Sequence, residues 1–346
     1  MSETPSKPYC PSHLRLIRRV QKSAFNPYGV TNVTRIAINQ PAMILFGGDC
    51  TDFPRVANNY ASMMESILKN ANIHDVQIYS AYYMFGDRNT FLDRVNIFRR
   101  AGDRVTLKAA NECKLANMNA NEPIPNIVQR AFNLIFKPRL VNATGHRRDI
   151  NSVVTNMRRI CLWAHSHGAA IIRQVSDYMA DQMRDMGFSN TEITQIQQNV
   201  LVIQHAPITP LHHVRFNTLS FASISDYMMD LNNNMSDWFF TKTKNYPPMY
   251  MSVASGNLII ASNLIIDGGD EHDTCQLRID PNWDKQLTPN GHVVFDAERN
   301  AIVAAAHNTI TAGEIPSVAE LVSGPTVDFE KMRQSGQAVY DHMVND

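Results

Sequence analysis

Short runs of apolar residues alternate along the chain with longer segments in which apolar residues recur at helical spacing. Residues 35–49, RIAINQPAMILFGGD, predict two short strands, and residues 53–71 predict a helix because apolar residues recur every three or four positions. The same reading gives strands within 75–83, 158–168, 199–207 and 217–226, a strand or hairpin within 257–267, and helices at 124–136, 169–187 and 328–346. Such alternation is typical of an α/β fold with a doubly wound, mostly parallel sheet flanked by helices.

The alternation runs through one continuous region rather than two. We therefore expect a single domain over residues 35–346, preceded by an N-terminal extension at 1–34. The polar stretch 86–122 is predicted to be an excursion from this domain, and the excursion is expected to contain one helix.

Composition narrows the classes of partner. The chain has 32 Lys plus Arg and 32 Asp plus Glu, so nothing in its charge favours nucleic acid. Its five cysteines are scattered without a CxxC pair, which argues against a disulfide framework and a structural zinc site.

Residues 1–23 lack the apolar core of a Sec signal, and no apolar run is long enough to span a membrane. We expect a soluble intracellular protein, with peripheral membrane contact left open.

The segment CLWAHSHGAA, residues 161–170, carries the candidate chemistry. Within it, Ala164-His165-Ser166-His167-Gly168 follows an apolar strand and precedes a helix, the context of the nucleophile elbow G-x-S-x-G. Ala164 replaces the first glycine with one extra methyl group, which still suits a tight turn. At such a bend Ser166 would project its hydroxyl above the sheet, and the N–H of His167 would point at a developing oxyanion.

In this motif and its strand–turn–helix order, the chain resembles the α/β-hydrolase superfamily, lipase- or esterase-like members most of all, over residues 35–310. In that superfamily the acid and then the histidine follow the nucleophile along the chain. The resemblance implies Asp226, just past the strand at 217–226, as the acid, with Asp230 and Asp237 as alternatives. It implies His272 as the base and His292 as its rival.

Two further segments complete the expected site. Gly47, Gly48 and Asp49 follow an early strand, where glycines let the backbone approach a ligand, so Gly48 and Asp49 are candidates for the second oxyanion donor. Residues 227–251 are rich in methionine and aromatic residues, and could form a lid in which Trp238 and Phe239 contact an acyl chain. The alternative for 227–251 is an insertion packed on the core.

The expected activity is hydrolysis of a carboxylic ester, with a small-molecule or lipid ester as substrate and no cofactor or metal. Two alternatives stay open. A His/Asp metal hydrolase is conceivable because several histidines and the run GGDEHD are present, although no H-E-x-x-H spacing occurs. A binding protein that keeps the fold without catalysis is the other, since fold does not set function.

Overall fold

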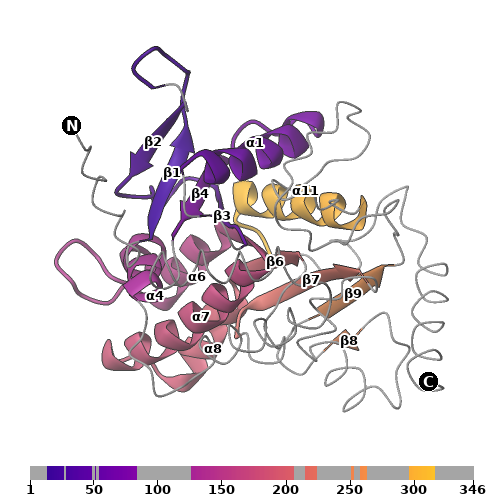
Figure 1. Ribbon diagram of the computed structural model, residues 1–346. Coiled ribbons are helices and arrows are strands. Elements are labelled where there is room, and N and C mark those ends of the chain that lie inside the picture. Colours follow the sequence, from indigo (N-terminus) through magenta and orange to yellow (C-terminus); the bar gives the residue numbers. More distant parts are fainter. Residues whose placement is uncertain are drawn as a thin grey trace, which may run out of the picture.

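The computed structural model describes residues 14–26, 29–48, 51, 54–83, 126–205, 215–223, 251–252, 258–262 and 296–315. These residues form a mostly parallel sheet with helices on both faces, which confirms the predicted fold class (Figure 1). The excursion predicted at 86–122 and the helix predicted at 328–346 lie outside the described residues, and so does the lid predicted at 227–251 except for Met251, which begins a short strand.

The described strands form one sheet in the order β2-β1-β4-β3-β5-β6-β7-β9-β8. The strands are β1 Arg15–Arg19, β2 Val30–Val33, β3 Ala42–Phe46, β4 Gln77–Tyr82, β5 Ile160–His165, β6 Leu201–His205, β7 Asn217–Ser223, β8 Met251–Ser252 and β9 Leu258–Ser262. From β4 to β9 every neighbouring pair is parallel, and antiparallel pairs close both ends. The region 15–33, expected as an extension, thus supplies two strands of the sheet.

Helices cover the two faces of the sheet. They are α1 Pro54–Asn70, α4 Asn126–Ala131, the π-helix η1 Phe132–Phe136, α5 Lys137–Leu140, α6 Ile150–Arg158, α7 His167–Asp185, α8 Asn190–Gln198 and α11 Asp296–Thr311. One face is packed by α1 and α11, and the other by α4, η1, α6, α7 and α8 (Figure 1). The helix predicted at 124–136 continues to Leu140 with a π stretch, which ends where Pro138, lacking an N–H, enters the helix.

Strand β5 shows why the centre of the sheet is apolar throughout. All six of its residues are buried, because helices pack on both of its faces. Leu162 and Ala164 belong to the core under α7, whereas Cys161 and Trp163 belong to the core under α1 and α11. Because β5 is packed on both faces, the core fixes the position in the sheet at which β5 ends and α7 begins.

Within the described residues, no helix has the length and apolar character needed to cross a membrane.

Candidate active site

Ser166 is the single residue between the end of β5 and the start of α7. Its φ of 49° and ψ of −113° place a non-glycine residue in a rarely populated region of backbone space. The Ser166 N–H donates to the His205 carbonyl at 3.0 Å, and its carbonyl accepts from the Ala169 N–H at 3.1 Å. Hydrogen bonds to β6 and to the first turn of α7 therefore hold the strained turn from both sides.

Gly168 allows α7 to begin directly against the end of β3. A Cβ at this position would lie 2.8 Å from the Gly47 carbonyl oxygen and closer still to that of Phe46. Backbone atoms cannot be displaced as a flexible side chain can, so the close approach requires glycine. The second small residue of the motif is therefore set by helix-to-strand packing.

Gly48 lies beside the candidate nucleophile. A Cβ on Gly48 would come within 3.1 Å of Ser166 Cβ and 3.0 Å of His165 Nδ1. The structure thus places Gly48 beside Ser166 and the backbone of His167, three of the residues that the sequence analysis singled out. Asp49 lies outside the described residues.

Three side chains hold the loop that carries Gly48. The Gly48 N–H donates to Tyr60 Oη at 3.4 Å, and its carbonyl accepts from Thr51 Oγ1 at 2.6 Å. The Tyr83 hydroxyl donates to the Gly47 carbonyl. Because the Gly48 N–H is engaged by Tyr60, the N–H of the following residue is the better candidate for an oxyanion donor.

A buried polar cluster lies under this loop on the α1 and α11 face, and we call it the Glu298 cluster. Its members are Tyr60, Trp163, His165, His205 and Glu298. Glu298 accepts from Trp163 Nε1 at 2.8 Å and contacts His205 Nδ1 at 2.7 Å, while Tyr60 Oη contacts His165 Nδ1 at 2.9 Å. The rings of Trp163, His165 and His205 pack with centroids 5.3–6.3 Å apart.

The Glu298 cluster connects the two halves of the candidate site. Tyr60 joins the Gly48 loop to the last residue of β5, and His205, held by Glu298, supplies the carbonyl that accepts from Ser166 N–H. Sequence reasoning missed Tyr60 and Glu298, because both look like ordinary helix residues. His165 itself is buried, with only 1% of its surface exposed.

No protein-family model matches the chain, and no curated protein matches it significantly. Among solved structures, the chain is similar to a candidate carboxylesterase from Lactobacillus plantarum, with 16% identity and a TM-score of 0.29 over 60% of this chain and 74% of that one. It is also similar to a poly(3-hydroxybutyrate) depolymerase from Bordetella parapertussis, with 11% identity and a TM-score of 0.27 over 84% and 86%.

A third similar structure is esterase B from Lactobacillus rhamnosis, inhibited by a tributyrin phosphonate. It shares 10% identity with a TM-score of 0.33, over 96% of this chain and 87% of that one. At these TM-scores the likenesses add nothing to the case for an activity, which rests on the geometry at Ser166.

The remaining predicted residues lie outside the described part of the chain. They are the acid Asp226 with its alternatives Asp230 and Asp237, the base His272 with its rival His292, and the lid residues Trp238 and Phe239. The strands that precede them are described, however, because β7 ends at Ser223 and β9 ends at Ser262. Both run parallel to β5, so they end at the same edge of the sheet as Ser166.

A metal-dependent hydrolase, the alternative to a serine enzyme, would need a cluster of metal ligands, and the part of the chain that the structure describes contains none. No three His, Cys, Asp or Glu side chains come together there as they would to hold a metal ion. His165 and His205 face each other, but they contact Tyr60 and Glu298 in separate pairs. The GGDEHD run lies outside the described residues.

Proposed function

We propose that this protein is a serine hydrolase that cleaves a carboxylic ester through Ser166. The observation that carries the proposal is the backbone of Ser166, with φ 49° and ψ −113°, on a single-residue turn at the carboxyl edge of a parallel sheet. Strained backbone persists where surrounding structure enforces it, and it gathers at active sites. A serine on such a turn is the defining feature of a nucleophile elbow.

In this proposal the oxyanion is stabilised from two directions. His167 is the first residue of α7, where N–H groups have no partner within the helix and the helix dipole favours negative charge. The loop after β3 would supply the second donor, and we assign this role to the Asp49 N–H because the Gly48 N–H donates to Tyr60. Together they would bind the negative oxygen formed when Ser166 attacks the ester carbonyl.

Asp226 and His272 would complete the triad. Two strand spacings separate β5 from β7, about 10 Å, and Asp226 follows the end of β7 by three residues, which can span about that distance. His272 follows β9 in the chain order expected of the base. His272 would take and return the Ser166 proton while Asp226 orients its ring, with His292 as the rival base.

The substrate class follows from the segment between β7 and β8. Residues 227–251 contain Trp238 and Phe239 together with several methionines, which suit an acyl chain. A lipid ester is therefore one option for the substrate, and peripheral contact with a membrane would accompany it. No cofactor takes part in the proposed reaction.

Labelling with a fluorophosphonate probe tests the proposal. The wild-type protein should be labelled, and Ser166→Ala should abolish labelling and lower ester turnover by roughly 10³-fold or more while the protein stays folded. Ser176→Ala is a matched control, because Ser176 is buried in the same helix and its hydroxyl donates to the Arg173 carbonyl. Ester hydrolysis that survives in Ser166→Ala would reject the serine mechanism and favour a metal hydrolase. A folded wild-type protein that neither labels nor hydrolyses esters would favour a binding protein.

The base is tested in the same assay. His272→Ala should lower turnover about as much as Ser166→Ala, and the double variant should lose little more, since triad residues act as a unit. If His292→Ala is the damaging change and His272→Ala is mild, the base is His292.

A further inference from the structure

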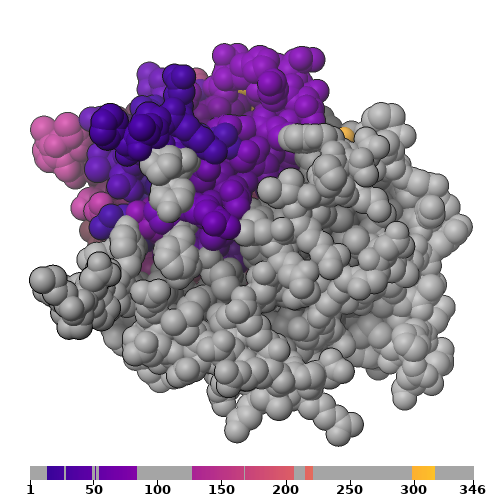
Figure 2. All heavy atoms as spheres, turned by 45° about the horizontal axis from the view of Figure 1, so that its top comes forward, coloured from indigo at the N-terminus to yellow at the C-terminus, as the bar shows by residue number. Residues whose placement is uncertain are grey.

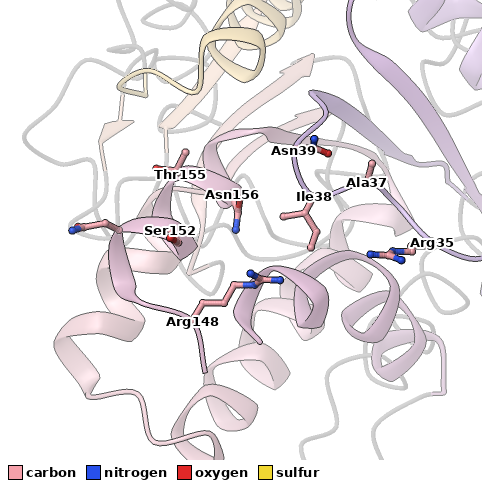
Figure 3. Close-up of a pocket in the computed structure, with 9 residues that line it drawn as sticks. Arg35, Ala37, Ile38, Asn39, Arg148, Ser152, Thr155 and Asn156 are labelled. Atoms are coloured by element: carbon pink, nitrogen blue, oxygen red, sulfur yellow. The ribbon is translucent and has the colours of Figure 1, made fainter. Parts of the chain in front are cut away.

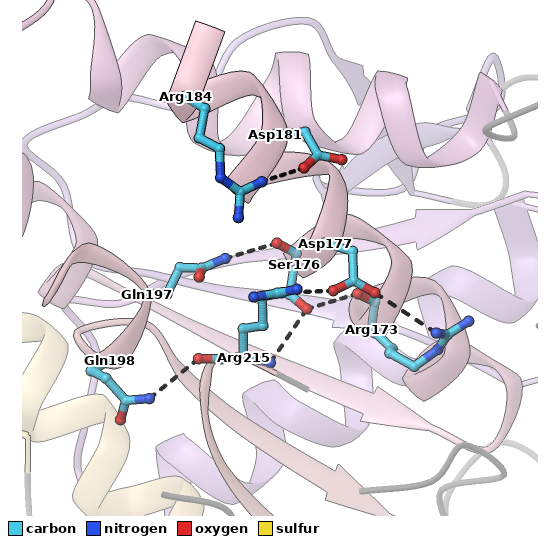
Figure 4. A network of polar contacts seen from close by, with 8 residues as sticks. All are labelled: Arg173, Ser176, Asp177, Asp181, Arg184, Gln197, Gln198 and Arg215. Carbon is cyan, nitrogen blue, oxygen red and sulfur yellow. Dashed lines mark hydrogen bonds and ion pairs between the residues drawn. The ribbon is translucent and has the colours of Figure 1, made fainter. Parts of the chain in front are cut away.

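A hollow opens at the end of the sheet that lies opposite to Ser166. It lies between the segment that leads into β3 and helix α6, which leads into β5, so it faces the amino ends of the parallel strands (Figure 3). Its volume is about 800 Å³, within the range of small-molecule sites. We call it the basic pocket, and its lining residues are Arg35, Ala37, Ile38, Asn39, Arg148, Asn151, Ser152, Thr155 and Asn156.

Two arginines give the basic pocket its charge. Arg35 and Arg148 enter from opposite sides, with their guanidinium groups turned toward the space between them (Figure 3). None of the described residues that line the pocket is a carboxylate, although acidic and basic residues are equal in number over the whole chain. Arg148 is held in place because its Nε donates to the Val141 carbonyl at 3.0 Å. Two convergent cations without a carboxylate between them favour an anionic ligand.

A third cation lies beneath the floor of the basic pocket. Arg139 is fully buried, and its Nη2 donates at 3.3 Å to the carbonyl of Ala37, a lining residue. Burial lowers the pKa of Arg139 to about 10, so it remains charged at neutral pH. Its second anchor is the Ile135 carbonyl, which accepts from Nη1 at 2.5 Å. This buried charge raises the positive potential of the pocket without taking up space in it.

The uncharged lining decides which anion fits. Asn39, Asn151 and Asn156 offer amide groups, and Ser152 and Thr155 offer hydroxyls, whereas the part of the lining that the structure describes contains no aromatic ring. The amino end of α6 is not the binding group, because the Asp149 side chain already accepts from the Ser152 N–H at 2.9 Å. Two guanidinium forks provide more donors than one carboxylate can accept, and phosphate matches them better. Amide and hydroxyl groups can hydrogen-bond to a ligand that carries many hydroxyl groups, whereas a nucleobase would need an aromatic ring on which to stack.

We propose that the basic pocket binds a phosphorylated polyol, with phosphate groups on Arg35 and Arg148 and hydroxyl groups on the asparagine amides. The same chemistry occurs in a soluble sugar phosphate and in a phosphoinositide headgroup. The site is separate from Ser166 and does not depend on ester hydrolysis.

Calorimetric titration of the full-length protein with inositol trisphosphate tests the site, with pyrophosphate as a second probe. Arg35→Gln should weaken binding about tenfold or more, since hydrogen bonds to charged groups are among the strong ones. Arg184→Gln is the matched control, because it removes the same charge from an exposed residue of α7 that pairs with Asp181. Ser166→Ala should bind as tightly as the wild-type protein.

Arg148→Gln should weaken binding at least as much as Arg35→Gln. Arg148 also bonds the Val141 carbonyl, so Arg35, which is exposed, is the variant that decides if Arg148→Gln fails to fold. Absence of binding by the wild-type protein would overturn the proposal. Equal affinity of Arg35→Gln and Arg184→Gln would do the same, because it would show attraction to net charge alone.

Vesicles distinguish the two sources of the ligand. Phosphatidylcholine vesicles with and without a minor fraction of phosphoinositide are mixed with the protein and sedimented. Co-sedimentation that requires phosphoinositide, is lost in Arg35→Gln and is competed by inositol trisphosphate would assign the pocket to a lipid headgroup. Binding of the soluble probe without co-sedimentation would assign it to a free phosphorylated polyol.

Discussion

Replacing Glu298 with alanine should destabilise the protein far more than replacing an exposed glutamate. Glu298 projects from α11, is fully buried, and lies 2.8 Å from Trp163 Nε1 and 2.7 Å from His205 Nδ1. The indole N–H can only donate, and a carboxylate can only accept, so Glu298 satisfies both neighbours at once. Alanine removes both acceptor oxygens, so the Trp163 indole and the His205 ring each lose the contact that Glu298 provides.

The expected magnitude follows from these two contacts. A hydrogen bond to a charged group contributes about 1.5–3 kcal/mol, and Glu298→Ala removes two such contacts. We therefore expect Glu298→Ala to lower the free energy of unfolding by about 3–6 kcal/mol. The unfolding entropy of a chain of this length converts that loss into a fall in melting temperature of roughly 4–8 °C.

Thermal and denaturant unfolding measure the effect. Glu65→Ala is the control, because Glu65 pairs with Arg19 at 3.1 Å on the surface and exposed ion pairs contribute about 1 kcal/mol or less. Trp163→Phe removes one donor, so its loss and that of Glu298→Ala should not add in the double variant. Equal stability of Glu298→Ala and Glu65→Ala would refute the view that Glu298 anchors the cluster.

Three further predictions concern residues near Ser166. Gly168→Ala should destabilise the protein by about 1–3 kcal/mol and lower turnover, because its Cβ meets the Phe46 carbonyl; an unchanged melting temperature would contradict this. Tyr60→Phe should lower kcat more than it raises KM, since the lost hydroxyl joins the Gly48 N–H to His165, and steady-state kinetics that match the wild type would argue against that role. Burial raises the pKa of Cys161, so iodoacetamide should alkylate it only after unfolding, as mass spectrometry of native and unfolded protein can show.

The central strands and the two long helices beside them were predictable from sequence for a definite reason. Strands β3, β5 and β6 are buried on both faces, so they appear as unbroken apolar runs, and α1 and α7 bury one stripe each. The pairing of β1 with β2 was not predicted, because its strands are short and partly exposed. Residues 35–41 read as a strand but form no strand, and β3 alone follows them.

The candidate site also has one part that the sequence predicts and another that it does not. The turn at Ser166 is a local feature, because small residues, a strand and a helix meet within a few positions, and the sequence shows all of them. The contacts of Tyr60 and Glu298 join residues more than a hundred positions apart, at Tyr60–His165 and Trp163–Glu298. No local pattern reports such contacts. Helix α11, which carries Glu298, was not predicted.

The two small residues that flank Ser166 have different physical causes. Ala164 is fully buried in β5 beneath α7, where its methyl group packs in the apolar core. Gly168 faces the backbone oxygens of Phe46 and Gly47, where no methyl group fits. The glycine that matters is therefore the one that lets α7 begin against β3, because this contact sets the first N–H groups of α7 beside Gly48. A motif written as small-x-Ser-x-Gly describes this geometry better than one that requires glycine at both positions.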